Sequence, residues 1–292
     1  MALNFSINKM RIISIIICIL LISCETEEEI KYNIFKYEKK LIVQGYISSD
    51  SKIVVKVGKS LPPLTNFTDT IDISVKEVRI KVIANDIPLF LLQEQGTGYF
   101  VSPDTFIANK HTKYQLEVTA EGFPSVISEP VYLPIMPQID SVSILTINEL
   151  DNIQLKFYDY DINKNYYYFQ RYIYHNGNKE IEDFFNGEKS SDPIFYSSKI
   201  IYDNMFNGKN YEIRDLFPTF FTYNDDTVKA DSIKVTLYTL SDELVKYLES
   251  LNEWDLTKDD MWQEIPVQIF SNIRGGYGIF YSFSRKSVTL KI

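Results

Sequence analysis

A chain of 292 residues, with 45% hydrophobic and 14% aromatic side chains, is long enough for one or two domains with substantial cores. Its formal net charge of −9 argues against nucleic-acid binding, because phosphate contacts require clusters of Lys and Arg and the sequence has none. The two cysteines, Cys18 and Cys24, both lie near the N-terminus. The rest of the chain therefore has no thiol for a disulfide, a thiolate metal site or cysteine catalysis.

The first element in chain order is a short apolar run from Ile12 to Leu21, preceded by Lys9 and Arg11. A helix needs about 20 residues to span a bilayer, whereas the apolar segment of a secretory signal takes roughly 7–15. The run continues into Leu-x-x-Cys, which ends at Cys24 and resembles the lipobox of bacterial lipoproteins. This resemblance implies that residues 1–23 are a cleaved signal peptide and that the thiol of Cys24 carries fatty acyl chains such as palmitate. The alternative is a plain secretory leader with an incidental cysteine.

Residues 24–39 are expected to form an acidic tether, since Glu25 to Glu29 contains four glutamates that cannot enter a bilayer. Each buried methylene contributes about 0.8 kcal/mol, so two or three acyl chains on one cysteine attach a protein stably without a transmembrane helix. An acidic tract at this place also resembles the surface-export signal of Bacteroidota lipoproteins. The resemblance implies an outer-membrane protein that faces the cell exterior, and the alternative is a merely solvated tether.

Residues 40–136 consist of short β-forming segments separated by turns, which predicts an Ig-like or transthyretin-like β-sandwich. Ile80 and Val82 alternate with charged residues, as in a strand with one buried face. Leu116 and Val118 show the same alternation. The expected strands span residues 41–47, 53–57, 78–83, 87–92, 96–100, 114–119 and 126–133.

Residues 137–292 are expected to form a second β-rich domain with one short helix, so the whole fold is predicted to be all-β. The helix should begin after Ser241 as its N-cap, carry Asp242 and Glu243 in its first turn and end near Trp254. Its apolar stripe is expected to cover the core rather than to dock a partner. The expected strands span residues 139–147, 153–158, 166–174, 193–202, 232–240, 266–270 and 287–292.

Asp159, Asp161, Asn163 and Asn165 alternate like the first half of a calcium-binding loop. The EF-hand pattern also requires Gly at its sixth position and Glu at its twelfth, and the chain has Lys164 and Gln170 there. We therefore expect a polar hairpin turn and no metal site.

Tyr166, Tyr168, Tyr172 and Tyr174 share one face of the expected strand 166–174. Such a face could stack sugar rings or dock a partner, and the alternative is that it lies buried inside the domain. Burial of these tyrosines would contradict the idea of a ligand platform.

The remaining motifs do not indicate catalysis. Gly275, Gly276 and Gly278 lack the strand–turn–helix context of a phosphate-binding loop and are expected to allow a bulge or a close backbone approach. His111 and His175 have no companion residues for a triad or a zinc site. We expect no catalytic residues and no cofactor, and a hydrolase with an unrecognised carboxylate pair is a remote alternative.

Several segments together resemble the Bacteroidota lipoprotein family named domain of unknown function four-two-four-nine. The segments are Leu41 to Ile47, Gly98-Tyr99 followed by Tyr114 to Val118, Pro137 to Val142, Asn165 to Tyr167 and Pro266 to Phe280. Members look like outer-membrane lipoproteins that are often encoded beside TonB-dependent receptors. The family has no established catalytic residues, so Cys24 is the one site that carries over.

The resemblance implies a non-enzymatic accessory or binding partner of a TonB-dependent receptor, held at the membrane by its lipid anchor. The ligand is not indicated by any residue pattern. A surface adhesin, or a structural spacer built from β-domains, is the alternative.

Overall fold

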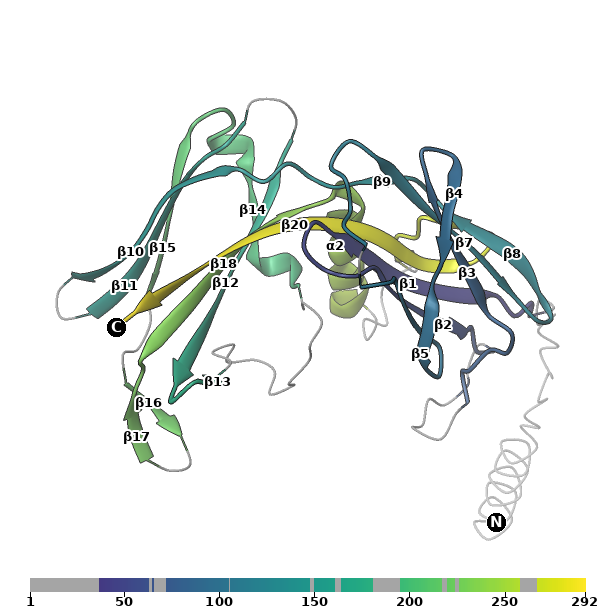
Figure 1. Ribbon diagram of the computed structural model, residues 1–292, viewed down its shortest axis with the longest axis horizontal. Coiled ribbons are helices and arrows are strands. Elements are labelled where there is room, and N and C mark those ends of the chain that lie inside the picture. The colour runs from purple at the N-terminus through teal and green to yellow at the C-terminus, as the bar shows by residue number, and fades with distance from the viewer. Residues whose placement is uncertain are drawn as a thin grey trace, which may run out of the picture. The chain divides into compact units, whose positions relative to one another are not determined.

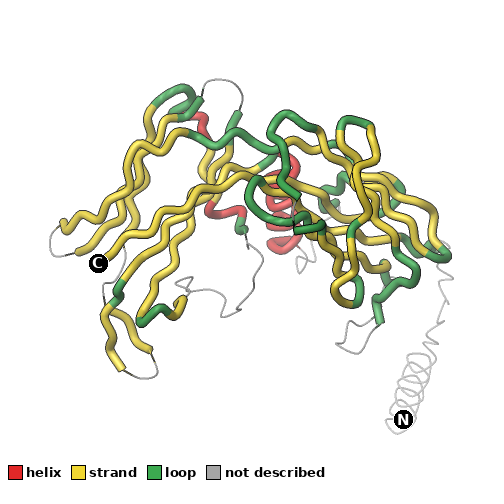
Figure 2. The backbone as a smooth tube through the Cα atoms, viewed as in Figure 1, coloured by secondary structure: helices red, strands yellow, loops and turns green. Residues whose placement is uncertain are grey.

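The computed structural model describes residues 37–62, 65, 72–104, 106–147, 150–160, 164–180, 195–216, 220–223, 226–257 and 267–292. Lys39–Ile292 forms one compact unit. Strands make up most of this unit, and the part of the chain that is described contains a single α-helix (Figure 2). The fold is thus β-rich, as predicted. No helix among the described residues is long and apolar enough to cross a membrane.

The largest sheet contains strands from both ends of the unit. Its strands are β1 (Leu41–Ser48), β2 (Val54–Lys59), β5 (Gln93–Gly96), β6 (Tyr99–Val101), β12 (Tyr166–His175), β13 (Asn178–Glu180), β14 (Ile200–Tyr202), β18 (Ser232–Leu240) and β20 (Tyr277–Lys291). The spatial order is β13-β12-β18-β20-β1-β2-β6-β5, and β14 also pairs with β12. We call it the long sheet.

Strand β20 joins the two ends of the long sheet (Figure 1). Its first half pairs in parallel with β1, and its second half pairs antiparallel with β18, with Phe283 belonging to both registers. The expected strand 287–292 is therefore only the end of a much longer strand. The predicted division into residues 40–136 and 137–292 stays a prediction, and strands from both sides of it are neighbours in this sheet.

A second sheet packs on the long sheet at the N-terminal end. It has the order β19-β8-β7-β3-β4, with β9 beside β7. Its strands are β3 (Arg79–Ala84), β4 (Ile87–Leu91), β7 (Lys113–Ala120), β8 (Phe123–Ser128), β9 (Val131–Tyr132) and β19 (Ile273–Arg274). The core between the sheets is mainly aliphatic, with Ile80 and Leu116 facing Val43 and Val55, all of them fully buried. We call this the first sandwich, and it confirms the predicted sandwich.

A third sheet, with the order β10-β11-β15, packs on the long sheet at its other end. Its strands are β10 (Gln138–Ile147), β11 (Leu150–Tyr158) and β15 (Asn210–Leu216), and a separate hairpin joins β16 (Phe220–Tyr223) to β17 (Asp226–Lys229). Phe157 and Leu155 of β11 pack against Tyr167 of β12 and Leu237 of β18. We call this the second sandwich.

The connector from residue 132 to residue 136 crosses the long sheet between the two sandwiches. Ser282 Oγ donates to the carbonyl of Tyr132 at 2.5 Å, and Ser284 Oγ donates to the carbonyl of Pro134 at 2.6 Å. Both serines are buried. These bonds explain why a strand as central as β20 carries small hydroxyl side chains, since each buried hydroxyl finds its acceptor on the connector.

The helix α2 (Asp242–Thr257) covers the opposite face of the long sheet (Figure 1). Its buried residues Leu244, Val245 and Leu248 pack in one cluster with Tyr46 and Phe283. The helix and its role as core cover were predicted. The predicted stripe was Leu244, Tyr247, Leu248 and Leu251, and the structure adds Val245 to the buried residues.

Several expected strands are wrong in part. Residues 197–199 form a 3₁₀ helix, η1, so that, among the described residues 195–202 of the expected strand 193–202, only residues 200–202 are strand. Residues 267–270 are not a strand, because the backbone N–H of Phe270 donates to Ser250 Oγ of α2 instead of to a neighbouring strand. Pro130 has no N–H, and the expected strand 126–133 divides around it into β8 and β9.

Candidate functional site

Cys24 and the expected signal peptide lie outside the described residues, as does the tether up to residue 36. Lipidation of Cys24 therefore stays a prediction. The described unit shows which of the other candidate residues come together.

The turn after β11, predicted to be a polar hairpin turn, contains a buried carboxylate that accepts several hydrogen bonds. Asp159 accepts from the side-chain amide of Asn165 at 3.0 Å, from the backbone N–H of Gly208 at 2.9 Å and from the hydroxyl of Tyr167. The carboxylate is fully buried. Asp161 and Asn163 lie outside the described residues. The described part of the turn thus acts as a hydrogen-bonded junction that ties β11 to β12.

A second buried carboxylate reinforces this junction. Asp203 accepts from the backbone N–H of Asn165 at 2.6 Å. The pKa of Tyr167 is raised, first by burial and then by its hydrogen bond to Asp159 and the negative charges of Asp159 and Asp203. Tyr167 is therefore held neutral, as a hydrogen-bond donor.

The tyrosine face of β12 is buried over its first half. Tyr166 is 6% exposed and donates from its hydroxyl to Asp242 of α2 at 2.9 Å. Tyr168 is 1% exposed and packs edge-on against Phe195. Tyr172 and Tyr174 are half-buried. The hypothesis of an open aromatic platform is therefore wrong for the first two tyrosines.

The two histidines lie apart from one another and do not form a common site. His111 is exposed in a loop, and His175 bonds through Nδ1 to the carbonyl of Lys229 at 2.8 Å.

The glycines allow close packing of the backbone. Gly278 has φ +109°, and a Cβ there would collide with the backbone of Val43 on β1. The glycine tract thus permits the close parallel pairing of β20 with β1. The sequence predicted a close backbone approach at these glycines but not its partner.

An exposed apolar row lies on β4, at the end of the second sheet. Ile87, Leu89 and Leu91 are 68%, 49% and 54% exposed, while Phe90 between them points inward and packs on Phe106. We call Ile87, Leu89 and Leu91 the β4 apolar row. Natural edge strands are usually protected by charged residues, so a row of aliphatic side chains here is unusual. The sequence shows a continuous apolar segment here, and whether a strand lies at an edge depends on pairing that no local pattern reports.

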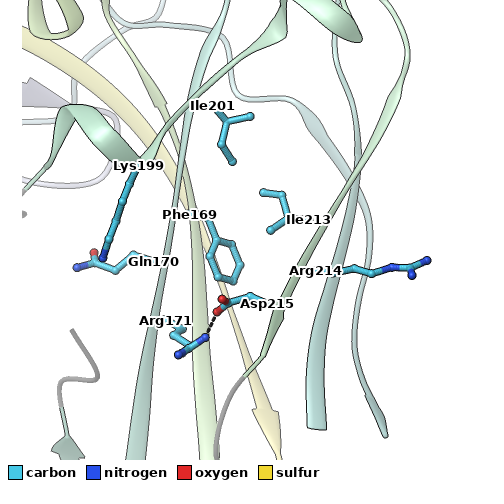
Figure 3. A pocket seen from close by; sticks show the side chains of 8 residues that line it. All are labelled: Phe169, Gln170, Arg171, Lys199, Ile201, Ile213, Arg214 and Asp215. Atoms are coloured by element: carbon cyan, nitrogen blue, oxygen red, sulfur yellow. Dashed lines mark hydrogen bonds and ion pairs between the residues drawn. The ribbon is translucent and has the colours of Figure 1, made fainter. Parts of the chain in front are cut away.

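A cavity of about 320 Å³ opens between β12 of the long sheet and β15 of the third sheet. Phe169, Ile201 and Ile213 face one hollow in the close-up, and Arg214 points away from it (Figure 3). We call this cavity the β12–β15 pocket. Its full lining is Phe169, Gln170, Arg171, Lys199, Ile201, Ile213, Arg214 and Asp215.

An ion pair crosses the pocket from one sheet to the other. Arg171 of β12 bonds to the carboxylate of Asp215 on β15, and its Nη1 also donates to the carbonyl of Leu216 at 2.7 Å (Figure 3). The Arg171 side chain is only 15% exposed. The pair holds the two sheets together at this opening. The sequence did not nominate these residues, because β15 was not predicted.

Two further cavities are present. One of about 330 Å³ lies where the connector meets the start of α2, and its lining includes Tyr132, Lys164 and Glu243. The other, of about 530 Å³, lies over β1 and β2 beside Lys56 and Tyr99. Both mix acids with lysines, and the β12–β15 pocket likewise combines Asp215 with cationic side chains.

Comparison with family models matches residues 27–289 to a family described as "Domain of unknown function (DUF4249)". The match confirms the family resemblance that the sequence motifs indicate and covers nearly all of the described unit. A search of curated proteins finds no match.

Proposed function

The chain belongs to the DUF4249 family, whose function is unknown, and we propose that it is a lipid-anchored outer-membrane protein whose β-rich body binds a TonB-dependent receptor. The body would face the cell exterior and act without catalysis. Its role would be to hold ligand at the receptor or to control entry.

The observation that carries this proposal is the leader. A basic start, a short apolar run, Leu-x-x-Cys at Cys24 and four glutamates directly after it form one continuous pattern. The apolar run is too short to anchor the protein as a spanning helix, whereas acyl chains on Cys24 would anchor it and leave the acidic segment in water.

The β4 apolar row favours a binding role over a spacer. Ile87, Leu89 and Leu91 expose aliphatic surface to water. Contact between aliphatic groups and water is unfavourable, so a partner that covers these side chains would be bound favourably. A spacer would have no need of such a surface. The row is therefore our candidate for the contact with the receptor.

Metabolic labelling tests the anchor. Cells that express the full-length protein are grown with an alkyne analogue of palmitate, and the purified protein is examined for the label. Wild type and Cys18→Ala should carry it, because Cys18 lies within the leader, and Cys24→Ala should not. Equal labelling of Cys24→Ala would contradict the proposed site.

Co-purification tests the partnership. The affinity-tagged protein is extracted from its native membranes in mild detergent, and bound proteins are identified by mass spectrometry. A TonB-dependent receptor in near-stoichiometric amount supports the proposal. A protein that elutes alone, both with and without chemical cross-linking before extraction, would contradict it.

A further inference from the structure

Strand β1 is the first strand that the predicted tether reaches, because residues 24–39 lead directly into Leu41. A pull on the tether is therefore applied to the N-terminal end of β1. The hydrogen bonds between strands lie across the strand direction rather than along it. A force along the strand therefore shears all of these bonds together, whereas a force across the strand breaks them one pair at a time.

Both sides of β1 are paired over most of its length. On one side, six residues from Leu41 to Tyr46 pair antiparallel with β2. On the other side, seven residues from Ile42 to Ser48 pair in parallel with β20. Strand β1 thus lies inside the long sheet, and a pull along its axis loads both sets of pairs together.

The parallel pairing with β20 sets the direction of the load. The two strands run side by side, and β20 continues past the end of β1 to pair with nine residues of β18 (Figure 1). Because β1 and β20 run in the same direction, opposite pulls on the start of β1 and on the end of β20 act along both strands. The load is then a shear, in which neither strand is peeled from its neighbour one pair at a time.

The side chains of β1 also resist sliding. Leu41, Val43 and Ile47 are fully buried in the core of the first sandwich, and Tyr46 packs on the other face of the sheet with the buried residues of α2. A slip of one residue would turn each of these side chains to the opposite face. Sliding of β1 therefore requires its core contacts to be lost together with its hydrogen bonds.

We propose that β1 is a mechanical clamp, which keeps the body folded when the tether and a bound partner pull it in opposite directions. Its role rests on the proposed function, because the tether can pull on β1 only when it is anchored. The shear geometry itself does not depend on the anchor. Labelling of Cys24 can therefore fail while the clamp is found, and the clamp can fail while Cys24 is labelled.

Single-molecule force spectroscopy tests the clamp by changing only the direction of the pull. Cys24 is the one cysteine in residues 24–292, so the mature chain, made without its leader and therefore unacylated, already has a thiol handle on the tether. In one variant, Lys291→Cys supplies the second handle, and the force runs along β1 and β20. In the other, Tyr277→Cys supplies it, and the force runs across the two strands, because Tyr277 lies opposite Ile42.

We expect the pull along the strands to require at least about twofold more force than the pull across them at the same loading rate, because the sheared bonds must break together. Lys59→Cys, opposite Leu41 on β2, gives a second pull across β1 that should also unfold the protein at low force. All three introduced cysteines replace residues that are at least partly exposed, so each variant should fold, which urea denaturation checks. Equal unfolding forces along and across the strands would overturn the proposal.

Discussion

The first and second sandwiches share the long sheet but differ in what fills them. The first core is mainly aliphatic, with Val43, Val55, Ile80 and Leu116 fully buried. The second combines aromatic rings with buried carboxylates, as where Phe157 packs against Tyr167 at 4.8 Å between ring centroids, beside Asp159. Aliphatic burial tolerates small shifts, whereas a buried carboxylate needs each of its donors in place. The second sandwich should therefore depend more on individual polar contacts.

The two regions also differ in their surfaces. The first sandwich exposes the β4 apolar row, and the second contains the β12–β15 pocket with its crossing ion pair. The first region thus has exposed aliphatic surface, and the second has a partly apolar cavity that an ion pair crosses. Substitutions in each region can test the comparison separately.

The largest effect is expected at the strand that both sandwiches share. Gly278→Ala would place a Cβ into the backbone of Val43 at a φ of +109°, so β20 could no longer pair closely with β1. We expect a loss of at least about 4 kcal/mol in the free energy of unfolding, or no folded protein at all. Urea denaturation measures it.

Gly122→Ala is the matched control for this change. Gly122 also has positive φ, at +76°, but no heavy atom lies within 4 Å of the Cβ position. The substitution should cost only about 1–2 kcal/mol. If both variants lose the same free energy of unfolding, then the positive φ of Gly278, and not the close approach of β20 to β1, explains why a glycine is needed there.

The next effect concerns the carboxylate of the second sandwich. Asp159→Ala leaves the donors of Asn165, Tyr167 and Gly208 without their buried acceptor, and we expect a loss of about 3–5 kcal/mol. Amide hydrogen exchange should show faster exchange in β11, β12 and β15 while β3 and β7 stay protected. Asp140→Ala, at an exposed position on β10, should stay within about 0.5 kcal/mol of wild type.

A substitution that creates a cavity in the first sandwich should speed hydrogen exchange there and leave the second sandwich protected. Leu116→Ala empties a fully buried position and should cost about 2–5 kcal/mol. Faster exchange is then expected in β3, β7 and β8. If both substitutions loosen both sandwiches equally, the long sheet couples them into one cooperative unit and the proposed contrast is wrong.

The sequence predicted the first sandwich better than the second for a physical reason. Ile80 and Val82 alternate with charged residues because one face of β3 is buried and the other is wet, and that signal is local. The parallel pairing of β1 with β20 joins residues more than two hundred positions apart, and no local pattern reports it. Strand β15 was missed because it is half exposed and its alternation is short: Tyr211 and Ile213 face the core, and Asp215 breaks the pattern.

For the candidate sites too, the sequence predicts what depends on local residues and misses what depends on distant contacts. Cys24 is a sequence motif, so it could be nominated without a fold. The burial of Tyr166 and Tyr168 depends on where α2 lies, and the pairing of Arg171 with Asp215 depends on two sheets meeting. Such contacts arise from tertiary structure, which alternation and turn signals do not encode.

Alkaline pH should weaken the packing of α2 on the long sheet, an effect smaller than those above that grows gradually with pH. Burial, followed by the hydrogen bond to Glu249 and its charge, raises the pKa of Tyr202 to about 12. The pKa of Tyr166 is also raised, first by burial and then by its bond to Asp242. In the unfolded chain tyrosine ionises near pH 10, so this stability is complete below about pH 10 and falls as the pH rises toward 12.

Urea midpoints measured between pH 8 and pH 12 check this dependence. Tyr202→Phe should make the decline above pH 10 shallower, because the variant has one fewer phenol to keep neutral. Tyr132→Phe, which removes an exposed phenol on the connector, serves as the comparison. A decline that Tyr202→Phe leaves unchanged would contradict the assignment.

The smallest effect on stability is expected at the β4 apolar row. Leu89→Lys combined with Leu91→Lys should shift the free energy of unfolding by no more than about 0.5 kcal/mol per residue, because both side chains are about half exposed. The same double variant should lose most of the co-purifying receptor. Leu256→Lys, at a 75% exposed position on α2, should retain it.

The central claim is that acyl chains on Cys24 hold this body at the outer membrane, and fractionation tests it most directly. Cells expressing wild type, Cys24→Ala or Cys18→Ala are lysed, and the outer membranes are separated from the soluble fraction and washed with high salt. We predict that wild type and Cys18→Ala stay with the outer membranes while Cys24→Ala is released or stalls as an uncleaved precursor in the inner membrane. Cleaved Cys24→Ala that remains in the washed outer membrane as fully as wild type would contradict the account.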